Sequence, residues 1–199
     1  MGRWEPNARG RLEEAALDLY IERGFEQTTV AEIAKRAGLT ERTFFRHFAD
    51  KREVLFGGSG ELQERLVDAV TAAPGAATPI DTITAALEAV GTLFADRHEK
   101  SQRRQSVISA NPELQERELI KLARLSRALA DALRHRGVPD PAASLAAEAG
   151  ITVFRVAFER WIAGTGRPDL TALMRESLDQ LKAVTAGQAP SLTSSNPLG

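Results

Sequence analysis

Apolar residues repeat at helical spacing along almost the whole chain, and no useful stretch alternates between apolar and polar residues as a half-buried strand does. One such stripe runs through Leu122, Leu125, Leu129 and Leu133. Residues that begin or end helices separate the stripes, with serine, threonine, aspartate or asparagine before them and glycine or proline after them. The pattern predicts an all-α protein of about nine helices.

Local signals set the bounds of the predicted helices. Thr29 and Glu32 have the spacing of a capping box, and Gly24 fits the position just after a helix. Asn111-Pro112 and Asp140-Pro141 each place proline at the first helical position after an N-cap residue. The predicted helices cover residues 8–23, 30–37, 41–47, from 51 onward, after 79, 101–109, 112–136, 141–163 and from 169 onward.

The fourth predicted helix contains three glycines, each of which costs roughly 1 kcal/mol relative to alanine in a helix interior. Leu55, Leu62 and Leu66 stay in phase across them, which favours one continuous helix. The glycines are either a hinge between two domains or a tolerated weak position. They are Gly57, Gly58 and Gly60.

Composition narrows the class of protein. The 199 residues suit one large or two small domains, and 43% hydrophobic residues suffice for a core. The absence of cysteine excludes disulfides, thiolate catalysis and cysteine-ligated zinc. No run approaches the ~20 apolar residues that span a bilayer, so we expect a cytoplasmic protein without a membrane partner.

Charge is distributed unevenly. The formal net charge of -1 does not by itself indicate a nucleic-acid binder. Residues 35–52, however, contain six lysines and arginines against two acidic residues, with His47 beside them. Because an average charge can conceal a basic patch, this stretch is the predicted site for any polyanion.

The segment from Thr29 to His47 has the pattern of a helix-turn-helix. Ala34 is small enough for a close helix crossing, and Gly38 can take the positive φ that the turn needs. Four apolar residues should face the first helix: Ile33, Leu39, Phe44 and Phe48. The side chains left to point outward are Arg42, Thr43, Phe45, Arg46 and His47. Arginine can bond guanine O6 and N7, and threonine or phenylalanine can contact a thymine methyl, so this face suits a major groove.

This segment resembles the signature of the TetR (tetracycline-repressor-like) family, and the match extends over about residues 8–56. The residues that carry it are Thr28-Thr29-Val30, Ile33-Ala34, Ala37-Gly38-Leu39-Thr40 and Thr43-Phe44-Phe45-Arg46-His47-Phe48, followed by Lys51 and Leu55. In the rest of the chain the match is one of helix number and length. The region around Asn111-Pro112 is similar to that of many actinobacterial regulators.

The resemblance implies a homodimer, usually a repressor, that an inducer releases from DNA. It implies phosphate contacts from Thr28 or Thr29 and from Lys51, and places 40–47 in the major groove. A two-fold dimer would read a near-palindromic operator in successive grooves. Phe45 departs from the tyrosine usual in the family, so a thymine contact would replace a phosphate hydrogen bond. The expected DNA contacts are Thr28, Thr29, Thr40, Glu41, Arg42, Thr43, Phe45, Arg46, His47 and Lys51.

We expect a DNA-binding domain at residues 1–56, a helical ligand-binding and dimerisation domain at 57–186 and a disordered tail at 187–199. The eighth predicted helix is apolar on more than one face, which fits a helix between its own core and a partner subunit. With the ninth helix it would form a four-helix dimer interface. The interface residues expected there are Val153, Val156, Ala157, Leu173, Leu178 and Leu181.

Sensing of a small apolar or amphipathic ligand is expected from the resemblance. A pocket needs apolar walls and a few polar groups, and the candidates are Phe94, Gln105, Ser109, Leu122, Phe154, Arg155 and Phe158. The aromatic members are equally explained as core. The basic cluster at residues 97–104 would either attract an anionic ligand or form a solvated face.

The sequence argues against an enzyme. The three histidines are widely spaced, and no metal-ligand pair, phosphate loop or nucleophile motif is present. We therefore assign no catalytic residue, metal ligand or cofactor. An activator of the same fold, or a helical interaction module without DNA binding, remains an alternative.

Overall fold

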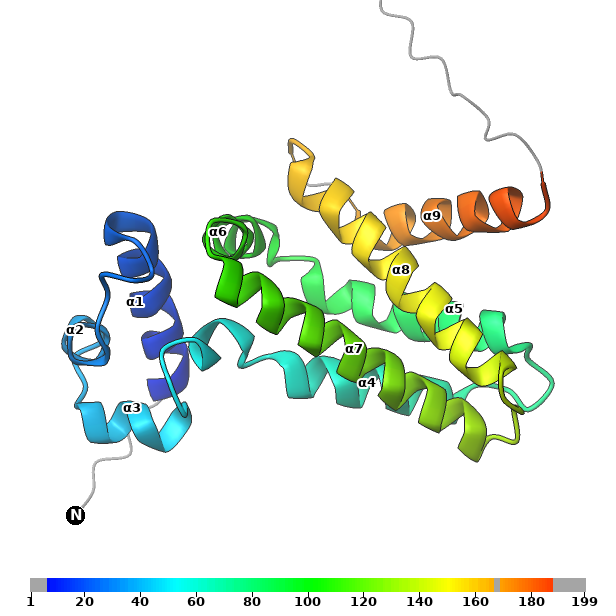
Figure 1. The fold of residues 1–199 in the computed structure, drawn as a ribbon, viewed down its shortest axis with the longest axis horizontal. Helices are drawn as coiled ribbons and strands as arrows, with labels where there is room; N and C mark the ends of the chain where they lie inside the picture. Colours follow the sequence, from blue (N-terminus) through cyan, green and yellow to red (C-terminus); the bar gives the residue numbers. More distant parts are fainter. Residues whose placement is uncertain (1–6, 167–168, 188–199) are drawn as a thin grey trace, which may run out of the picture. The chain divides into compact units, whose positions relative to one another are not determined.

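The computed structural model describes residues 7–166 and 169–187, and within these ranges it is helical without strands (Figure 1). The elements are α1 Ala8–Arg23, α2 Val30–Arg36, α3 Glu41–His47, η1 Glu53–Phe56, α4 Ser59–Ala72, α5 Pro79–Gly91, η2 Thr92–Phe94, α6 His98–Ser109, α7 Pro112–His135, α8 Ala142–Ala163 and α9 Leu170–Thr185. The predicted fold class and helix number are confirmed. The first and third helices have the predicted bounds, and α6 begins three residues earlier than predicted.

The chain divides into two compact units. One contains residues 1–65 and 97–128, and the other contains residues 66–96 and 129–199. This division follows packing, whereas the boundary predicted at residue 56 separates a DNA-binding function from a ligand-binding function. The functional boundary stays a prediction. The predicted disordered tail lies outside the described residues except for Gly187.

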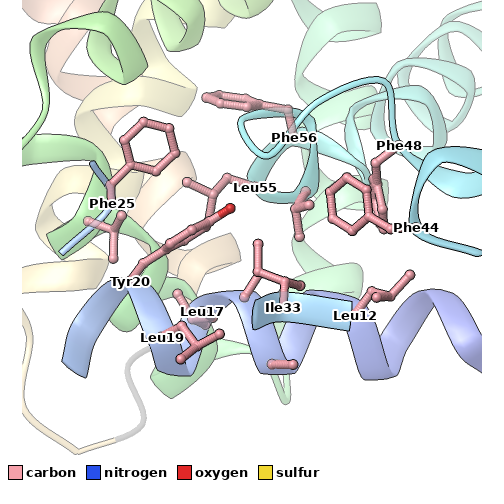
Figure 2. Close-up of a cluster of buried hydrophobic side chains, with 14 of the residues drawn as sticks. Leu12, Leu17, Leu19, Tyr20, Phe25, Ile33, Phe44, Phe48, Leu55 and Phe56 are labelled. Atoms are coloured by element: carbon pink, nitrogen blue, oxygen red, sulfur yellow. The ribbon is translucent and has the colours of Figure 1, made fainter. Parts of the chain in front are cut away.

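The core of the first unit joins segments that are distant in sequence. Side chains of α1, α2, α3 and η1 form one buried cluster, and Val107, Ile108 and Leu114 from α6 and α7 belong to it (Figure 2). The ring centroids of Phe44 and Phe48 lie 5.6 Å apart. Figure 2 shows both side chains in this cluster. Helix α3 is therefore held by a core to which α6 also contributes.

Ion pairs add to the packing of α6 against α1. Lys100 lies 3.3 Å from Glu13, Arg103 lies 3.0 Å from Glu14, and Arg103 also pairs with Asp18. The basic cluster at residues 97–104 was predicted either to attract an anionic ligand or to be solvated. Lys100 and Arg103 of this cluster instead form ion pairs that connect α6 to α1 within the first unit.

The fourth predicted helix is not continuous, which corrects the sequence-based prediction. A 3₁₀ turn, η1, ends at Phe56, and α4 begins only at Ser59. The Ser59 hydroxyl donates to the Phe56 carbonyl at 2.6 Å, and Arg9 donates to the Gly57 carbonyl. Both carbonyls are thus bonded by side chains in place of helical amides, and glycine's low helix propensity makes the break inexpensive.

The second unit packs α5 and α9 against α8. α8 carries the buried face Ala143, Ala147, Gly150, Phe154 and Trp161. Gly150 permits a close crossing with α5, because a Cβ there would lie 2.3 Å from Cγ2 of Ile83. Arg136 donates to the carbonyls of Thr71, Ala73 and Pro74 and so caps the end of α4.

Replacing Gly150 with alanine should destabilise the second unit. Ile83 is buried and stiff at χ1, so it cannot easily yield to the new Cβ. An overpacking cost of about 1–3 kcal/mol outweighs the gain of roughly 1 kcal/mol from removing a helical glycine. Urea denaturation should show a lower midpoint than that of the unsubstituted protein. Gly60→Ala, whose Cβ meets nothing within 4 Å, is the control and should not lower the midpoint.

Candidate nucleic-acid interface

The starts of α2 and α3 are capped as the sequence predicts. Thr29 accepts from the Glu32 amide at 3.3 Å, and the Glu32 carboxylate accepts from the Thr29 amide at 2.9 Å, which completes a capping box. The hydrogen bonds that the Thr29 amide and then the Thr29 hydroxyl donate to the Glu32 carboxylate lower the pKa of Glu32. Thr40 accepts from the Thr43 amide at 3.2 Å. Both helix starts are therefore well defined, and the two capping threonines are exposed.

The turn between α2 and α3 is tightly bonded. Gly38 has φ +66°, and its amide donates to the Lys35 carbonyl at 3.0 Å. The Leu39 amide donates to the Ala34 carbonyl at 2.8 Å, and the Arg11 guanidinium donates to the Ala37 carbonyl. A Cβ on Gly38 would lie 2.7 Å from Arg11 Nη2. The positive φ, which residues with a Cβ rarely adopt, favours glycine at this position.

The outward face of α3 carries the side chains expected there. Phe44 is fully buried, whereas its neighbour Phe45 is 55% exposed. Arg42 and Arg46 are exposed, and the partly buried His47 lies 3.5 Å from Arg46 through its Nε2. An apolar ring beside two guanidinium groups thus lies open on this unit. Glu41 is exposed next to this face, and Thr43 is partly buried.

The cations of the helix-turn-helix fall into two groups. Arg23 pairs with Glu32 at 2.9 Å, Arg36 pairs with Glu22 at 2.7 Å, and Arg52 pairs with Asp50 at 3.3 Å. Within described residues 7–58, the cations without a carboxylate or carbonyl partner are Lys35, Arg42 and Arg46. The uncommitted positive charge is therefore concentrated on α3 and the end of α2.

Lys51 has partners within the protein. Its ammonium donates to the carbonyls of Phe25, Glu26 and Thr28 at 2.9, 3.2 and 3.1 Å and lies 4.4 Å from the centroid of the Phe25 ring. An ammonium has three donors, so these bonds use all of them. Lys51 therefore connects the segment that follows α3 to the segment between α1 and α2. A phosphate contact from Lys51 stays a prediction.

Tyr20 reinforces the same closure. Its hydroxyl donates to the Lys51 carbonyl at 2.6 Å, so the Lys51 residue is held at both its side chain and its backbone. Burial, together with the nearby Asp50 carboxylate, raises the pKa of Tyr20 and keeps it a donor.

The two threonines expected near phosphate differ in exposure. Thr28 is buried, and its hydroxyl donates to the Gly24 carbonyl at 2.9 Å. Thr29 is exposed at the start of α2. The resemblance named either threonine as a phosphate contact. Of the two, Thr29 presents its side chain to solvent.

A polar network that sequence analysis missed joins η1 to α6 and α7. Arg104 donates to the Leu55 carbonyl at 2.6 Å and to Glu118 at 2.8 Å, and Lys121 donates to Glu118 at 2.6 Å. Burial, and then the charge of Arg104, lowers the pKa of Lys121 to about 8. Burial would raise the pKa of Glu118, but the charges of Arg104 and Lys121 lower it. No motif marks this network, since Arg104 is 49 residues from Leu55 and 14 residues from Glu118 in the sequence.

The structure brings together part of the expected ligand pocket. Phe94, Phe154, Phe158 and Trp161 form an aromatic cluster in the second unit, with Phe94 and Phe158 centroids 5.8 Å apart. Arg155 is exposed and pairs with Glu159 at 3.2 Å. The other three candidates belong to the first unit, where Gln105 donates to Ser109 at 3.3 Å and Leu122 is partly buried on α7.

The expected interface residues also divide by burial. Val153, Ala157 and Leu178 are buried within their own unit, whereas Val156, Leu173 and Leu181 are partly exposed. A groove of about 180 Å³ lies between α8 and α9, lined by Thr152, Val153, Val156, Ser177, Gln180, Leu181 and Val184. An interface on this face would therefore use the partly exposed residues.

Comparison with family models identifies the class of protein. Residues 12–56 match the model described as bacterial regulatory proteins of the tetR family, and residues 77–186 match the model of the MftR C-terminal domain. The second match alone covers more than half of the chain. The chain belongs to the TetR family, whose members are DNA-binding transcriptional regulators, a non-enzymatic role.

Curated relatives come from actinobacteria. The chain is 37% identical over 82 residues to the transcriptional regulator TcmR of Streptomyces glaucescens, with 41% of this chain and 36% of TcmR covered. It is 28% identical over 115 residues to MftR of Mycobacterium tuberculosis, with 58% of each chain covered. The matches thus span less than two thirds of either relative.

Solved structures share the fold. FadR from Bacillus subtilis in complex with stearoyl-CoA matches with a TM-score of 0.61 at 22% identity, covering 86% of this chain and 96% of that one. A TetR-family regulator from Syntrophomonas wolfei matches with a TM-score of 0.65 at 15% identity, covering 92% and 97%. Among the described residues, no helix is both long and apolar enough to span a membrane.

Replacing Lys51 with methionine should lower stability, because the Glu26 and Thr28 carbonyls lose their donor and the Phe25 carbonyl keeps only the Thr28 amide. We expect a loss of about 1–3 kcal/mol in the free energy of unfolding, measured by denaturant titration. Lys35→Met is the control. Its ammonium has no carboxylate or carbonyl partner, so it should change stability by no more than about 0.5 kcal/mol. Unchanged stability in Lys51→Met would show that the three bonds do not support the fold.

Proposed function

We propose that this protein is a sequence-specific transcriptional regulator that binds a near-palindromic operator as a homodimer and represses until a small apolar or amphipathic ligand releases it. One observation carries the proposal. The cations that the helix-turn-helix leaves uncommitted lie with the exposed Phe45 on α3 and the adjacent end of α2.

Direct reading of bases would come from α3. Arg42 and Arg46 are four residues apart and share one helix face. A guanidinium can bond guanine bidentately, and the Phe45 ring can contact a thymine methyl. The capped helix starts at Thr29 and Thr40 direct backbone amides outward, which suits phosphate. Glu41, Thr43 and His47 complete the proposed surface, and the phosphate contact expected from Lys51 is part of the proposal.

Dimerisation would place two such surfaces on one duplex. α8 and α9 expose apolar side chains, with Leu145 at 66% and Val184 at 61% exposure. Val156 and Leu181 line the groove between these helices. The groove is a contiguous and mainly apolar surface, and surfaces of that kind mark interaction sites. A two-fold dimer through this face would set two recognition helices in successive major grooves, about 34 Å apart.

The proposed ligand site is the aromatic cluster of the second unit. Phe158 is only partly buried, unlike Trp161 beside it at a centroid distance of 5.6 Å. An accessible ring at the edge of a cluster suits an acyl chain. The FadR structure from Bacillus subtilis holds stearoyl-CoA, which makes that molecule the first probe.

DNA binding should depend on the uncommitted arginines. Arg42→Ala and Arg46→Ala should each weaken binding to DNA from upstream of the gene in a gel-shift titration. Removing an arginine that binds phosphate should reduce the salt slope by about 1, and removing one that bonds a base bidentately should cost about 1–3 kcal/mol for the operator. A promoter-reporter assay then distinguishes repression from activation.

The matched control for these variants is Arg36→Ala. Arg36 forms two hydrogen bonds to Glu22, at 3.0 and 2.7 Å, so it should contribute less to the salt slope. Equal losses of affinity in Arg36→Ala and Arg46→Ala would contradict the division of cations. A protein that binds no DNA at low salt would instead support an interaction module.

Stearoyl-CoA should release the protein from operator DNA, as measured by fluorescence anisotropy of a labelled duplex. Phe158→Ala should raise the concentration required by about ten- to a hundredfold, since burying an aromatic side chain against an acyl chain contributes about 1.5–3 kcal/mol. DNA affinity without the probe should stay unchanged. Release that is identical in Phe158→Ala would exclude this cluster as the site, and release by coenzyme A alone would exclude an apolar determinant.

A further inference from the structure

The α8–α9 groove contains a buried hydroxyl without a hydrogen-bond partner. Ser177 is only 6% exposed, and among the described residues its Oγ is the buried side-chain polar atom that finds no partner. The groove around it is otherwise mostly aliphatic, with Val153, Val156 and Leu181 in its walls. A buried polar group left unpaired is costly, so a partner for Ser177 would have to come from whatever fills the groove.

α9 presents a regular seam beside this groove. Leu173, Ser177, Gln180 and Val184 follow one another at intervals of four, three and four residues, which is the a/d spacing of helices that pack side by side. The seam is apolar at both ends and polar in the middle. This sequence of apolar and polar side chains matches that of a second copy of α9 that runs in the opposite direction.

We propose that Ser177 and Gln180 set the register of the dimer, with Gln180 of a second copy filling the groove and bonding the Ser177 hydroxyl. This rests on the proposed dimerisation through α8 and α9. In an isologous two-fold contact, residue i meets j and j meets i. Antiparallel α9 helices that pair Ser177 with Gln180 also pair Leu173 with Val184, so polar meets polar and apolar meets apolar along the whole seam.

Other registers leave the polar pair unsatisfied. Sliding one helix so that Ser177 faces Leu173 or Val184 would bury the hydroxyl against an aliphatic side chain. It would also leave the Gln180 amide without the hydroxyl. A polar pair at seam positions therefore selects one alignment over alternatives that bury as much apolar surface, which is the established use of buried polar residues in helix pairing.

The absence of cysteine makes the register directly measurable. Leu173→Cys and Val184→Cys are prepared separately in the full chain and then mixed under mild oxidation. The mixture should form a disulfide-linked dimer on a non-reducing gel, because the inference places these positions opposite each other. Each variant alone should remain uncrosslinked. Two copies of the same position would lie about 16 Å apart along the helices, from a rise of 1.5 Å per residue, beyond disulfide reach.

Light scattering on the unmodified protein separates the two possible failures. A monomer at working concentrations overturns both the dimer and its register. A dimer whose mixed variants do not crosslink, or whose single variants crosslink as well as the mixture, overturns the register alone. Efficient crosslinking only in the mixture supports it. Circular dichroism of each variant confirms that helicity is retained.

A double-mutant cycle tests the proposed bond itself. Ser177→Ala and Gln180→Met should each weaken the dimer about tenfold in an equilibrium sedimentation measurement, because each leaves one buried polar group unpaired. The double variant should weaken the dimer by less than the product of the two effects, since removing both partners leaves no unsatisfied group. Effects that multiply independently would overturn the direct contact between the two side chains.

Discussion

The helix-turn-helix depends on the three hydrogen bonds that the Lys51 ammonium donates across the turn after α1. The carbonyls of Phe25, Glu26 and Thr28 lie in a short connection between helices, where the Thr28 amide donates to the Phe25 carbonyl at 3.3 Å and no helical amide bonds the other two. Lys51 satisfies them from the far side of α3, and Tyr20 holds its backbone. One side chain thus joins the segment before α2 to the segment after α3. This connection helps to fix the orientation of α3, which carries the exposed Phe45.

The same reasoning explains why cations in this region differ in role. Arg23 and Arg36 are matched with carboxylates, and Arg11 is matched with a carbonyl. Exposed pairs contribute little to stability, so their main consequence is to remove positive charge from competition for an anion. Lys35, Arg42 and Arg46 keep their charge uncompensated by any carboxylate contact within the described part of the domain. A near-neutral chain can therefore present a cationic surface without an excess of basic residues.

Local signals in the sequence predicted local structure well. Gly24 follows α1 and Thr40 caps α3, and because such signals act within a few residues the bounds of α1 and α3 were predicted correctly. The break before α4 was missed because it depends on Arg9 reaching the Gly57 carbonyl, a contact across 48 positions. Helical spacing was enough to predict which side chains of α3 point outward. Which threonine is buried and which lysine is engaged depended on tertiary contacts that no spacing encodes.

The association of α6 with the helix-turn-helix shows what such contacts add. Its apolar side chains enter the core of α1 and α3, and its cations bond Glu13, Glu14 and Asp18. Arg104 extends the connection to the Leu55 carbonyl of η1, which directly follows the segment anchored by Lys51. A displacement of α6 would therefore have to break buried apolar contacts and at least four polar ones, or else carry α1 and η1 with it. Because the polar contacts are directional, moving α6 together with α1 and η1 disturbs fewer of them than moving α6 alone. The helix-turn-helix and α6 therefore behave as one packed unit.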